Sequence, residues 1–421
     1  MKKQLPSCEW EAFFACYQEK PKKGLRVNPL RLSAAEFQKI SPYALTPVAW
    51  EKNGFLVEEE KLGAHPYHFA GVYYSQEPSA MCAAPLLEVK AGEIVLDLCS
   101  APGGKGTQLA AEMGGEGLIV LNEPVFSRAK ILSQNVERLG IKNAIVTCAK
   151  PDELSAVFPE CFDKILIDAP CSGEGMFKKN AEEALSEWSE ENIALCAARQ
   201  AEILKEGAKM LRKGGRLVYS TCTFSQEEDE GQVRDYLEKH PEMRLLKQEK
   251  LYPHKVAGEG HFAALFEKTD GGENQPRAKR GNAKKDSEKA YRAFEKEFFI
   301  SPFADSLYEI GGALYALPSV CYDWGSLQVL RVGVRLGEVK NGRFEPDHSL
   351  AMSAKKSQVR KVLDLSLHDP RTEKFLRGET VEGEIENGWC LVCVDGFPLG
   401  LGKAVNGTIK NHIPKGIRKK A

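Results

Sequence analysis

The segment from Glu93 to Ala111, EIVLDLCSAPGGKGTQLAA, constrains the fold of this 421-residue chain more than any other stretch. Its apolar run from Ile94 to Leu98 is typical of a strand buried on both faces of a parallel sheet. Pro102, Gly103 and Gly104 then break the strand, and a helical pattern follows. Backbone amides that open a helix at the carboxyl end of a strand attract a nucleoside or a carboxylate. The segment therefore predicts a ligand-binding loop in an α/β domain.

Two common phosphate-binding motifs do not match this loop. A Walker loop would need glycine at Cys99 and serine or threonine at Gly106. A dinucleotide fingerprint read from Gly104 and Gly106 would need its third glycine at Leu109. These mismatches argue against a bound triphosphate or pyrophosphate.

An acidic residue, Glu123, follows Gly103 by about twenty residues and comes after a second predicted strand, Leu118 to Leu121. Its carboxylate can accept hydrogen bonds from ribose hydroxyls. S-adenosylmethionine, a nucleoside cofactor without pyrophosphate, fits this pattern better than NAD. Another α/β protein with a glycine-rich turn is the alternative on the loop alone.

Length and composition indicate a multidomain protein with ample core, since 43% of the residues are hydrophobic and 28% are charged. No stretch is long and apolar enough for a signal peptide or membrane span, so we expect a cytoplasmic protein without a membrane partner. Twelve irregularly spaced cysteines then indicate reduced thiols, not a disulfide framework.

Basic residues cluster although the net charge is only −1. The clusters lie at Lys20–Arg31, Arg277–Lys296 and Gly396–Ala421. Such patches suit the phosphates of a nucleic acid. Ordinary solvated surface, or a disordered linker, explains any single patch equally well.

A small N-terminal domain, residues 1–75, is predicted with helices at Cys8–Gln18 and Ser33–Ile40, the second with a Ser33/Glu36 capping box. Aromatic and imidazole side chains gather near the end of this domain and could stack on bases, although packing between domains is the commoner role of such residues; they are His65, His68, Tyr73 and Tyr74.

The central domain, residues 76–268, alternates predicted strands and helices, which indicates a doubly wound parallel sheet. The further strands are Ala144–Cys148, Phe162–Ile167 and Arg216–Ser220; the helices are Ser127–Leu139, Ser189–Leu211 and one capped by Ser225 and Glu228. Ligands of such sheets lie beyond the carboxyl ends of the strands. Five candidate groups fall at predicted strand ends: Cys99, Glu123, Asp168, Cys171 and Cys222.

Thiols at this carboxyl edge of the sheet, which we call the rim, suggest covalent activation of a pyrimidine. A thiolate that adds to C6 makes C5 electron-rich enough to take a methyl group, and sulfur leaves again easily. A cysteine after a strand is more often a small buried residue, which is the expected role of Cys99. Asp168 could equally be a helix N-cap. The joint occurrence of Cys171 and Cys222 shifts the balance toward catalysis.

Three motifs, DLCSAPGGK, DAPCSGEGMF and STCTFSQEEDE, resemble those of the RNA (cytosine-5)-methyltransferases of the Nol/Nop/Sun family. The stretches RVNPLRLS, YYSQEPSAM and FPLGLGKAVNGTIKNHIPKGIR are similar to its bacterial RsmF type, which acts on a cytidine of 16S rRNA in the small ribosomal subunit. The resemblance spans nearly the whole chain with the motifs in order. It implies a Rossmann-like class I methyltransferase that binds RNA, acts as a monomer and uses S-adenosylmethionine.

The resemblance also implies roles for individual residues. Cys222 would be the nucleophile, Cys171 would assist release of the methylated product, and Asp168 would serve both cofactor and cytosine. The cofactor-binding set would be Cys99, Ser100, Ala101, Pro102, Gly103, Gly104, Lys105, Glu123, Arg128 and Asp168. The family's acidic or amide residue near adenine falls at about Lys150, with Asp152 two residues beyond, so the adenine contact is not placed. The runner-up assignment makes Cys171 the nucleophile, because its Pro-Cys setting resembles that of DNA cytosine methyltransferases.

The C-terminal third is predicted as a basic linker, residues 269–296, a first α+β domain, 297–365, and a PUA-like RNA-binding module, 366–421. Its predicted elements are strands at Ala313–Leu317, Gln328–Leu336 and Trp389–Val394, and a helix near Ser357–Leu365. Cys390 and Cys393 have metal-type spacing, but no second pair follows and Leu391-Val392 reads as a strand, so we expect no metal.

Two rival functions stay open at this point. The motifs do not exclude tRNA as the substrate. A non-catalytic ribosome-assembly factor could keep the fold for RNA binding alone, although intact Cys222 and Asp168 argue against it.

Overall fold

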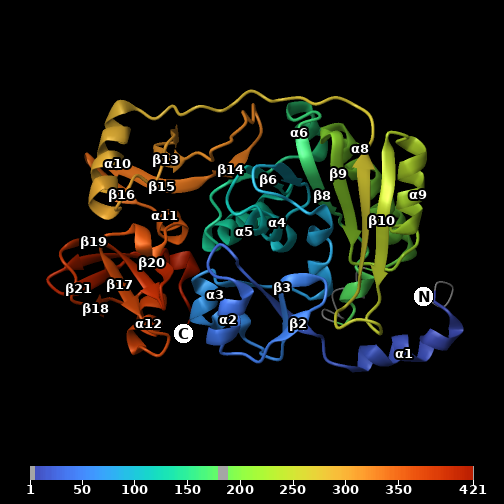
Figure 1. Ribbon diagram of the computed structural model, residues 1–421, viewed down its shortest axis with the longest axis horizontal. Coiled ribbons are helices and arrows are strands. Elements are labelled where there is room, and N and C mark those ends of the chain that lie inside the picture. The colour runs from blue at the N-terminus through green and yellow to red at the C-terminus, as the bar shows by residue number, and fades with distance from the viewer. Residues whose placement is uncertain (1–4, 179–187, 421) are drawn as a thin grey trace.

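The computed structural model describes residues 5–178 and 188–420 and contains four sheets with their helices (Figure 1). The largest sheet has eight strands in the order β10-β11-β9-β8-β5-β6-β7-β14. Its strands are β5 (Ile94–Asp97), β6 (Leu118–Asn122), β7 (Ala144–Thr147), β8 (Phe162–Asp168), β9 (Leu211–Thr221), β10 (Met243–Leu251), β11 (His261–Lys268) and β14 (Val329–Val332). The five strands from β9 to β7 are parallel, and the remaining three are antiparallel to their neighbours.

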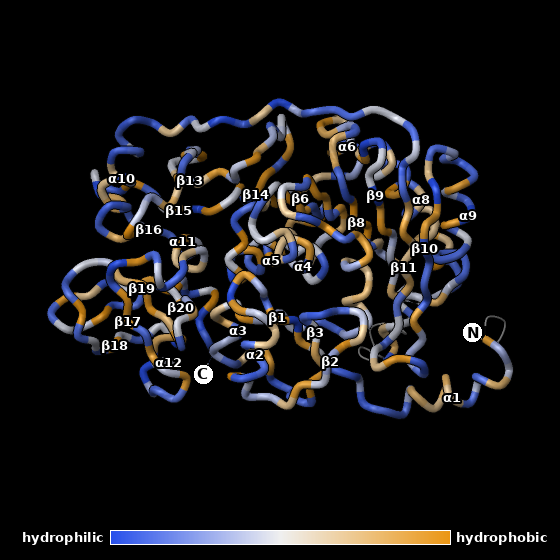
Figure 2. The backbone as a smooth tube through the Cα atoms, viewed as in Figure 1, coloured by the Kyte–Doolittle hydropathy of each residue, from blue (hydrophilic) through white to orange (hydrophobic). Residues whose placement is uncertain are grey.

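Helices cover both faces of this sheet, which is why its central strands are continuously apolar. Side chains alternate along each strand: Val95 packs with α4 (Gly104–Glu112) and α5 (Phe126–Arg138). Its neighbour Leu96 packs on the other side with α6 (Pro151–Val157), α8 (Glu190–Met210) and α9 (Glu230–Lys239). Figure 2 shows the hydrophobic residues concentrated on these strands. The doubly wound, Rossmann-like fold expected from the sequence is confirmed.

Local signals placed most helices of this domain well. The helix predicted from Ser189 begins after that residue, whose hydroxyl accepts the amide of Asn192. One cap is wrong: α9 begins at Glu230, and Ser225 instead bonds Glu227 while Glu228 is fully buried. The capping pattern is wrong here because Ser172 and Gln200, which are distant in the sequence, hydrogen-bond to the Glu228 carboxylate.

The N-terminal sheet, β2-β3-β1-β4, lies next to the eight-stranded sheet near α4 (Figure 1). Its strands are β1 (Lys23–Val27), β2 (Thr46–Val48), β3 (Glu51–Val57) and β4 (Tyr73–Ser75), with helices α1 (Trp10–Ala15), α2 (Ala34–Ile40) and α3 (Pro66–Phe69). The capping box of Ser33 and Glu36 is present at the start of α2.

The segment predicted as a linker is structured over its second half. Residues 285–298 form α10 (Lys285–Phe298), whose Tyr291, Phe294 and Phe298 are buried against a third sheet. That sheet has the order β12-β13-β15-β16, with strands Leu307–Ile310, Ala313–Ala316, Val334–Lys340 and Arg343–Pro346. The linker interpretation missed the aromatic stripe of α10 because basic residues surround it.

The strand predicted at Gln328–Leu336 is two strands. Gly333, at φ +51°, separates β14 from β15. β14 pairs with β7 at the edge of the eight-stranded sheet, whereas β15 belongs to the third sheet, β12-β13-β15-β16. One chain segment therefore joins two sheets.

The last sheet, β17-β19-β20-β21-β18, contains strands Val362–Leu365, Gly388–Val394, Phe397–Val405, Thr408–Asn411 and Val381–Glu382. Along the chain, α11 (His348–Ser353) precedes β17, and α12 (Pro370–Leu376) connects β17 to β18. The helix predicted near Ser357–Leu365 is wrong, because Val362–Leu365 pairs in parallel with β19 and belongs to this sheet. The sheet shares a hydrophobic core with the N-terminal domain. Cys390 and Cys393 are both buried in β19. No helix among residues 5–178 and 188–420 is long and apolar enough to cross a membrane.

Candidate active site

The glycine-rich loop lies between β5 and α4 at the carboxyl end of the sheet. Gly103, at φ +113°, is the N-cap of α4, a conformation that favours glycine. Gly106 lies where a Cβ would come 2.5 Å from Ser100 Oγ and 2.6 Å from Asp97 Oδ2. Glycine at this position lets α4 pack directly on the end of β5.

Asp97 is a candidate site residue that we did not single out from the sequence. It is fully buried; the Ser100 hydroxyl and the Cys99 amide lie close enough to lower its pKa, but no described residue makes a well-aligned hydrogen bond to either carboxylate oxygen. Burial raises the pKa of Asp97 to about 7. Unused buried acceptors of this kind suit an ammonium group, such as that of the methionine part of S-adenosylmethionine.

Glu123 lies at the end of β6, 2% exposed, and accepts the amide of Val125 at 2.9 Å. Arg128 approaches its other oxygen at 3.3 Å and also donates to the carbonyl of Ala101 at 3.0 Å. Arg128 thus ties the glycine loop to the acidic strand end. A carboxylate beside the loop, together with the unpaired Asp97, fits a nucleoside cofactor that carries an amine.

The side chain of Lys105 points away from this half of the rim and toward Asp168. Its Nζ lies 2.7 Å from Asp168 Oδ2, while Ser220 donates to Oδ1 at 2.8 Å. Burial favours the neutral acid, yet the ion pair with Lys105 and the hydrogen bond from Ser220 hold the pKa of Asp168 below its ordinary value. Asp168 is therefore a carboxylate at neutral pH, and the N-cap alternative does not describe its contacts.

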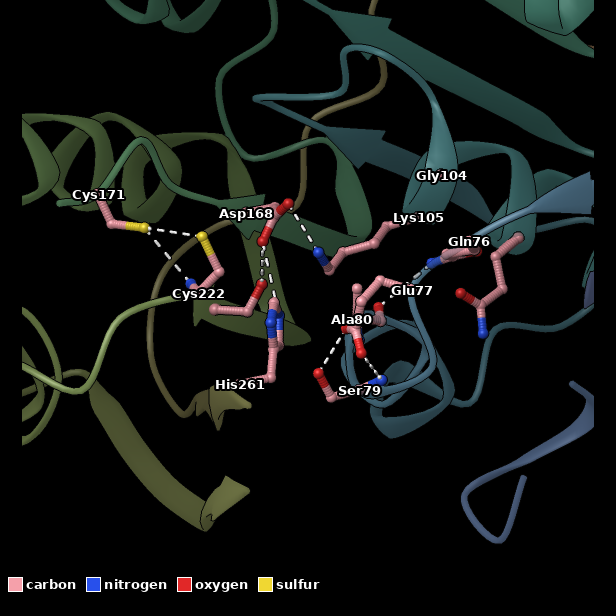
Figure 3. A network of polar contacts seen from close by, with 12 residues as sticks. Gln76, Glu77, Ser79, Ala80, Gly104, Lys105, Asp168, Cys171, Cys222 and His261 are labelled. Carbon is pink, nitrogen blue, oxygen red and sulfur yellow. Dashed lines mark hydrogen bonds and ion pairs between the residues drawn. The ribbon is translucent and has the colours of Figure 1, made fainter. Parts of the chain in front are cut away.

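The two predicted thiols meet at the ends of neighbouring parallel strands. Cys171 follows β8 and Cys222 follows β9, and their Sγ atoms are 3.3 Å apart (Figure 3). The amide of Cys222 also donates to Cys171 Sγ at 3.4 Å. The contact with Cys222, reinforced by burial, raises the pKa of Cys171 well above its ordinary value. Cys171 therefore stays a neutral thiol and can donate a hydrogen bond.

A buried carboxylate holds the two thiol-bearing loops together. Glu228 accepts the amide of Ser172 at 3.0 Å, the Ser172 hydroxyl, and Gln200 Nε2 at 2.8 Å. The Ser172 hydroxyl also contacts Thr223 Oγ1 at 2.8 Å. Because Ser172 follows Cys171 and Thr223 follows Cys222, this network sets the spacing of the two sulfur atoms.

His261 is a second residue that sequence reasoning missed. It is 2% exposed, and its Nε2 lies 3.7 Å from Asp168 Oδ1. Figure 3 shows its ring pointing toward Asp168, with Cys222 on one side and Lys105 on the other. Burial and the Lys105 ammonium lower the pKa of His261 to about 3, so the imidazole is neutral. The only sequence signal was a histidine that opens the apolar run up to Phe266, a segment that was not predicted as a strand.

Other predicted residues have packing roles. Tyr73 is fully buried and Tyr74 is 8% exposed, beneath Arg26 and Arg138, so neither presents a free ring for base stacking. His65 and His68 contact aromatic rings of the same domain. The Cys99 side chain packs against the main core. Lys150, the N-cap of α6, and Asp152, in its first turn, are both exposed.

Models of known protein families match most of the chain. The family model of 16S rRNA methyltransferase RsmB/F matches residues 84–271. Models of the RsmF N-terminal domain, first C-terminal domain and PUA domain match residues 1–78, 293–353 and 362–419.

Similar curated proteins are named ribosomal RNA small subunit methyltransferase F. The protein of Enterobacter sp. (strain 638) is 32% identical, over 99% of this chain and 94% of its own length. That of Vibrio vulnificus (strain YJ016) is 32% identical, over 98% and 94%.

Two similar solved structures come from Pyrococcus horikoshii. A methyltransferase homologue is 29% identical, with a TM-score of 0.57, over 63% of this chain and 92% of that one. NSun6 with SFG, a S-adenosylmethionine analogue, is 22% identical, with a TM-score of 0.58 over 64% and 97%, and shows the fold alone. The chain belongs to the RsmF family of S-adenosylmethionine-dependent 16S rRNA methyltransferases.

Proposed function

We propose that this methyltransferase modifies C5 of a cytidine in 16S rRNA through a covalent bond between Cys222 and C6. The observation that carries the proposal is the pair of thiols 3.3 Å apart beside the Lys105–Asp168 ion pair. A methyltransferase for an exocyclic amine has no chemical need for such a pair, whereas C5 of cytosine is a poor nucleophile until a thiolate adds at C6.

The first step is addition of the Cys222 thiolate to C6 of the target base. Asp168, a carboxylate at neutral pH, accepts a hydrogen bond from the exocyclic amine instead of protonating N3. The Lys105 ammonium beside it stabilises the negative charge that develops on the ring. The ion pair therefore orients the base and stabilises the adduct at once.

The methyl donor is held by the other half of the rim. Glu123, Arg128, Asp97 and the loop from Cys99 to Gly104 would hold S-adenosylmethionine. When bound, it supplies the electrophilic methyl group that the activated C5 takes. Lys105 and Asp168 lie between this half and the thiols, so the ion pair would face both the cofactor and the base.

Release requires that Cys222 leave C6. The neutral Cys171 thiol lies within contact of the Cys222 sulfur and donates a hydrogen bond to it as the C6–S bond breaks. This arrangement favours Cys222 as the nucleophile and Cys171 as the group that assists departure.

The target cytidine must leave its base stack to reach a rim of this kind. The N-terminal domain and the region that the PUA model matches share one hydrophobic core, and both would contact the RNA that carries this cytidine. The reaction on small-subunit rRNA would take place in the cytoplasm, with the enzyme acting as a monomer.

The decisive experiment is transfer of labelled methyl from S-adenosylmethionine to RNA of cells that lack this gene, followed by identification of the nucleoside. We expect 5-methylcytidine in 16S rRNA alone, and no transfer by Cys222→Ala. Label in tRNA would identify tRNA, instead of 16S rRNA, as the substrate. Cofactor binding without transfer to any RNA would favour a ribosome-assembly factor. A Cys171→Ala variant without adducts, beside a Cys222→Ala variant that forms them, would reverse the two cysteine roles.

A further inference from the structure

His261 reaches the catalytic rim because β11 runs antiparallel to β9. The parallel strands bring their carboxyl ends to this rim, whereas an antiparallel strand brings its first residue, which in β11 is His261. Phe262 pairs with Thr221, so His261 and Cys222 lie side by side, one position beyond that pair. Cross-strand neighbours share a face of the sheet, which places the imidazole beside the Cys222 thiol.

The imidazole is buried without a hydrogen-bond partner. Neither ring nitrogen bonds any described residue, and the side chain is 2% exposed. A buried polar group of this kind is costly unless a ligand or a reaction uses it. Its charged neighbours are Asp168, 3.7 Å from Nε2, and Lys105, which pairs with the same carboxylate.

The proposed reaction leaves one role without a group. After methylation, C5 still carries its proton, and a base must take it before Cys222 can leave. Asp168 already accepts Lys105 and Ser220, and Cys171 is a neutral thiol. Of these groups, His261 alone offers a nitrogen lone pair that no neighbour occupies.

The order of the strands indicates which face of the base carries that proton. The cofactor residues lie at β5 and β6, Asp168 lies at β8, and Cys222 and His261 lie at β9 and β11. A methyl group that arrives from the β5 side enters the face of C5 opposite the sulfur. The C5 hydrogen is thereby turned toward the sulfur, the side on which His261 lies.

The geometry points to His261 as the catalytic base that removes the C5 proton, an inference that rests on the proposed C5 methylation. The imidazole lone pair takes the proton, and the C5–H electrons form the C5–C6 double bond. The C6–S bond then breaks, and its electron pair returns to Cys222. Asp168 is the counter-charge of the imidazolium, whose low pKa of about 3 makes it pass the proton on to solvent rapidly, and the restored aromatic ring drives the step.

The test uses the full-length enzyme, labelled S-adenosylmethionine and small-subunit rRNA that carries tritium at C5 of cytidine. We expect His261→Gln to transfer methyl in the first turnover as the wild type does. Its tritium release and turnover should fall about 100-fold, a typical contribution of a general base. A methylated RNA–protein adduct should accumulate on denaturing gels. Added imidazole should restore tritium release in His261→Ala.

His348→Gln is the matched control, because His348 is also a buried histidine with an unpaired Nδ1 but lies on α11 outside the site. It should release tritium at the wild-type rate. Wild-type release by His261→Gln would overturn the proposal, as would loss of first-turnover methyl transfer in a variant that still binds cofactor. If His261→Gln does not fold, His261→Asn carries the same test. A wild-type enzyme that releases no tritium while methylating RNA contradicts the proposed C5 chemistry itself.

Discussion

The Sγ atoms of Cys171 and Cys222 lie 3.3 Å apart although 51 residues separate them in the chain. Strands β8 and β9 are adjacent and parallel, so the residues that follow them meet at one rim. The contact leaves one thiol neutral and places it against the other, which suits a donor and a leaving nucleophile.

Cys222→Ala should abolish methyl transfer and adduct formation, with a loss of at least about 1000-fold, because the nucleophile is gone. Cys171→Ala should retain the first methyl transfer and accumulate the adduct, because departing sulfur loses its donor. Denaturing gels with labelled RNA distinguish the two outcomes. Cys8→Ala, which removes an exposed thiol elsewhere, should behave as the wild type.

Glu228→Ala should weaken both folding and catalysis. It leaves the Ser172 amide, the Ser172 hydroxyl and Gln200 without their buried acceptor, which lowers the free energy of unfolding by about 1–3 kcal/mol. The thiols also lose their spacing, so single-turnover methyl transfer should slow more than cofactor binding weakens. Glu228→Gln keeps an acceptor and should restore most of both properties; equal loss in the two variants would contradict a positioning role.

Lys105→Met should slow methyl transfer by roughly 100-fold or more, because the charge that stabilises the adduct is removed. The pKa of Asp168 should rise toward its ordinary range, since Lys105 is the largest influence that lowers it. Rates across pH check this shift. Lys52→Met removes a lysine that pairs with Glu112 far from the rim and should leave the rate unchanged. An effect on cofactor affinity alone would instead support the cofactor-binding role implied by the resemblance.

Cofactor affinity should increase as pH rises through about 7. Burial raises the pKa of Asp97 to about 7, and only its carboxylate form attracts an ammonium group. Asp97→Asn should remove this pH dependence and weaken binding by about 10- to 100-fold, the range of a charged hydrogen bond. Calorimetric titration of S-adenosylmethionine between pH 6 and pH 8 measures both effects. An unchanged pH profile in the variant would exclude Asp97 as the cause.

The free energy of unfolding of the cofactor-free protein should decrease as pH rises, which is opposite to the change in cofactor affinity. A folded-state pKa raised from 3.8 to about 7 means that protonation favours the folded state. The contribution of Asp97 is complete below pH 3.8 and is lost as pH rises through 7. Asp97→Asn should therefore gain stability relative to the wild type above pH 7, and urea unfolding at pH 5 and pH 8 tests the difference.

Gly333→Ala should loosen the junction between the methyltransferase sheet and the third sheet, β12-β13-β15-β16. Its φ is +51°, and a Cβ would lie 2.1 Å from the carbonyl oxygen of Ala316, so the free energy of unfolding should fall by about 2 kcal/mol or more. Gly342→Ala is the matched control, since Gly342 also has positive φ but nothing lies near its would-be Cβ. Equal losses, measured by urea unfolding, would mean that the close contact has no effect of its own.

The elements predicted well are those whose signals are local. The strand before the glycine-rich loop and the capping box at Ser33 each depend on signals within a few residues, and the structure contains both. The segment 357–365 was mistaken for a helix because its pairing partner, β19, lies some thirty residues away. The backbone hydrogen bonds that make this segment a strand come from β19, and a local sequence pattern cannot reveal them.

The sequence by itself determined which groups could act in the site: a glycine loop, a strand-end carboxylate and two thiols that follow strands. Their meeting at one rim followed from the rule that parallel strands end together. Only the tertiary structure brought in His261 and Glu228. The first arrives through an antiparallel strand, whose opening residue no rule for parallel strands selects, and the second through a buried network between two loops. Both depend on contacts between segments far apart in the chain, and these form only when the sheet is assembled.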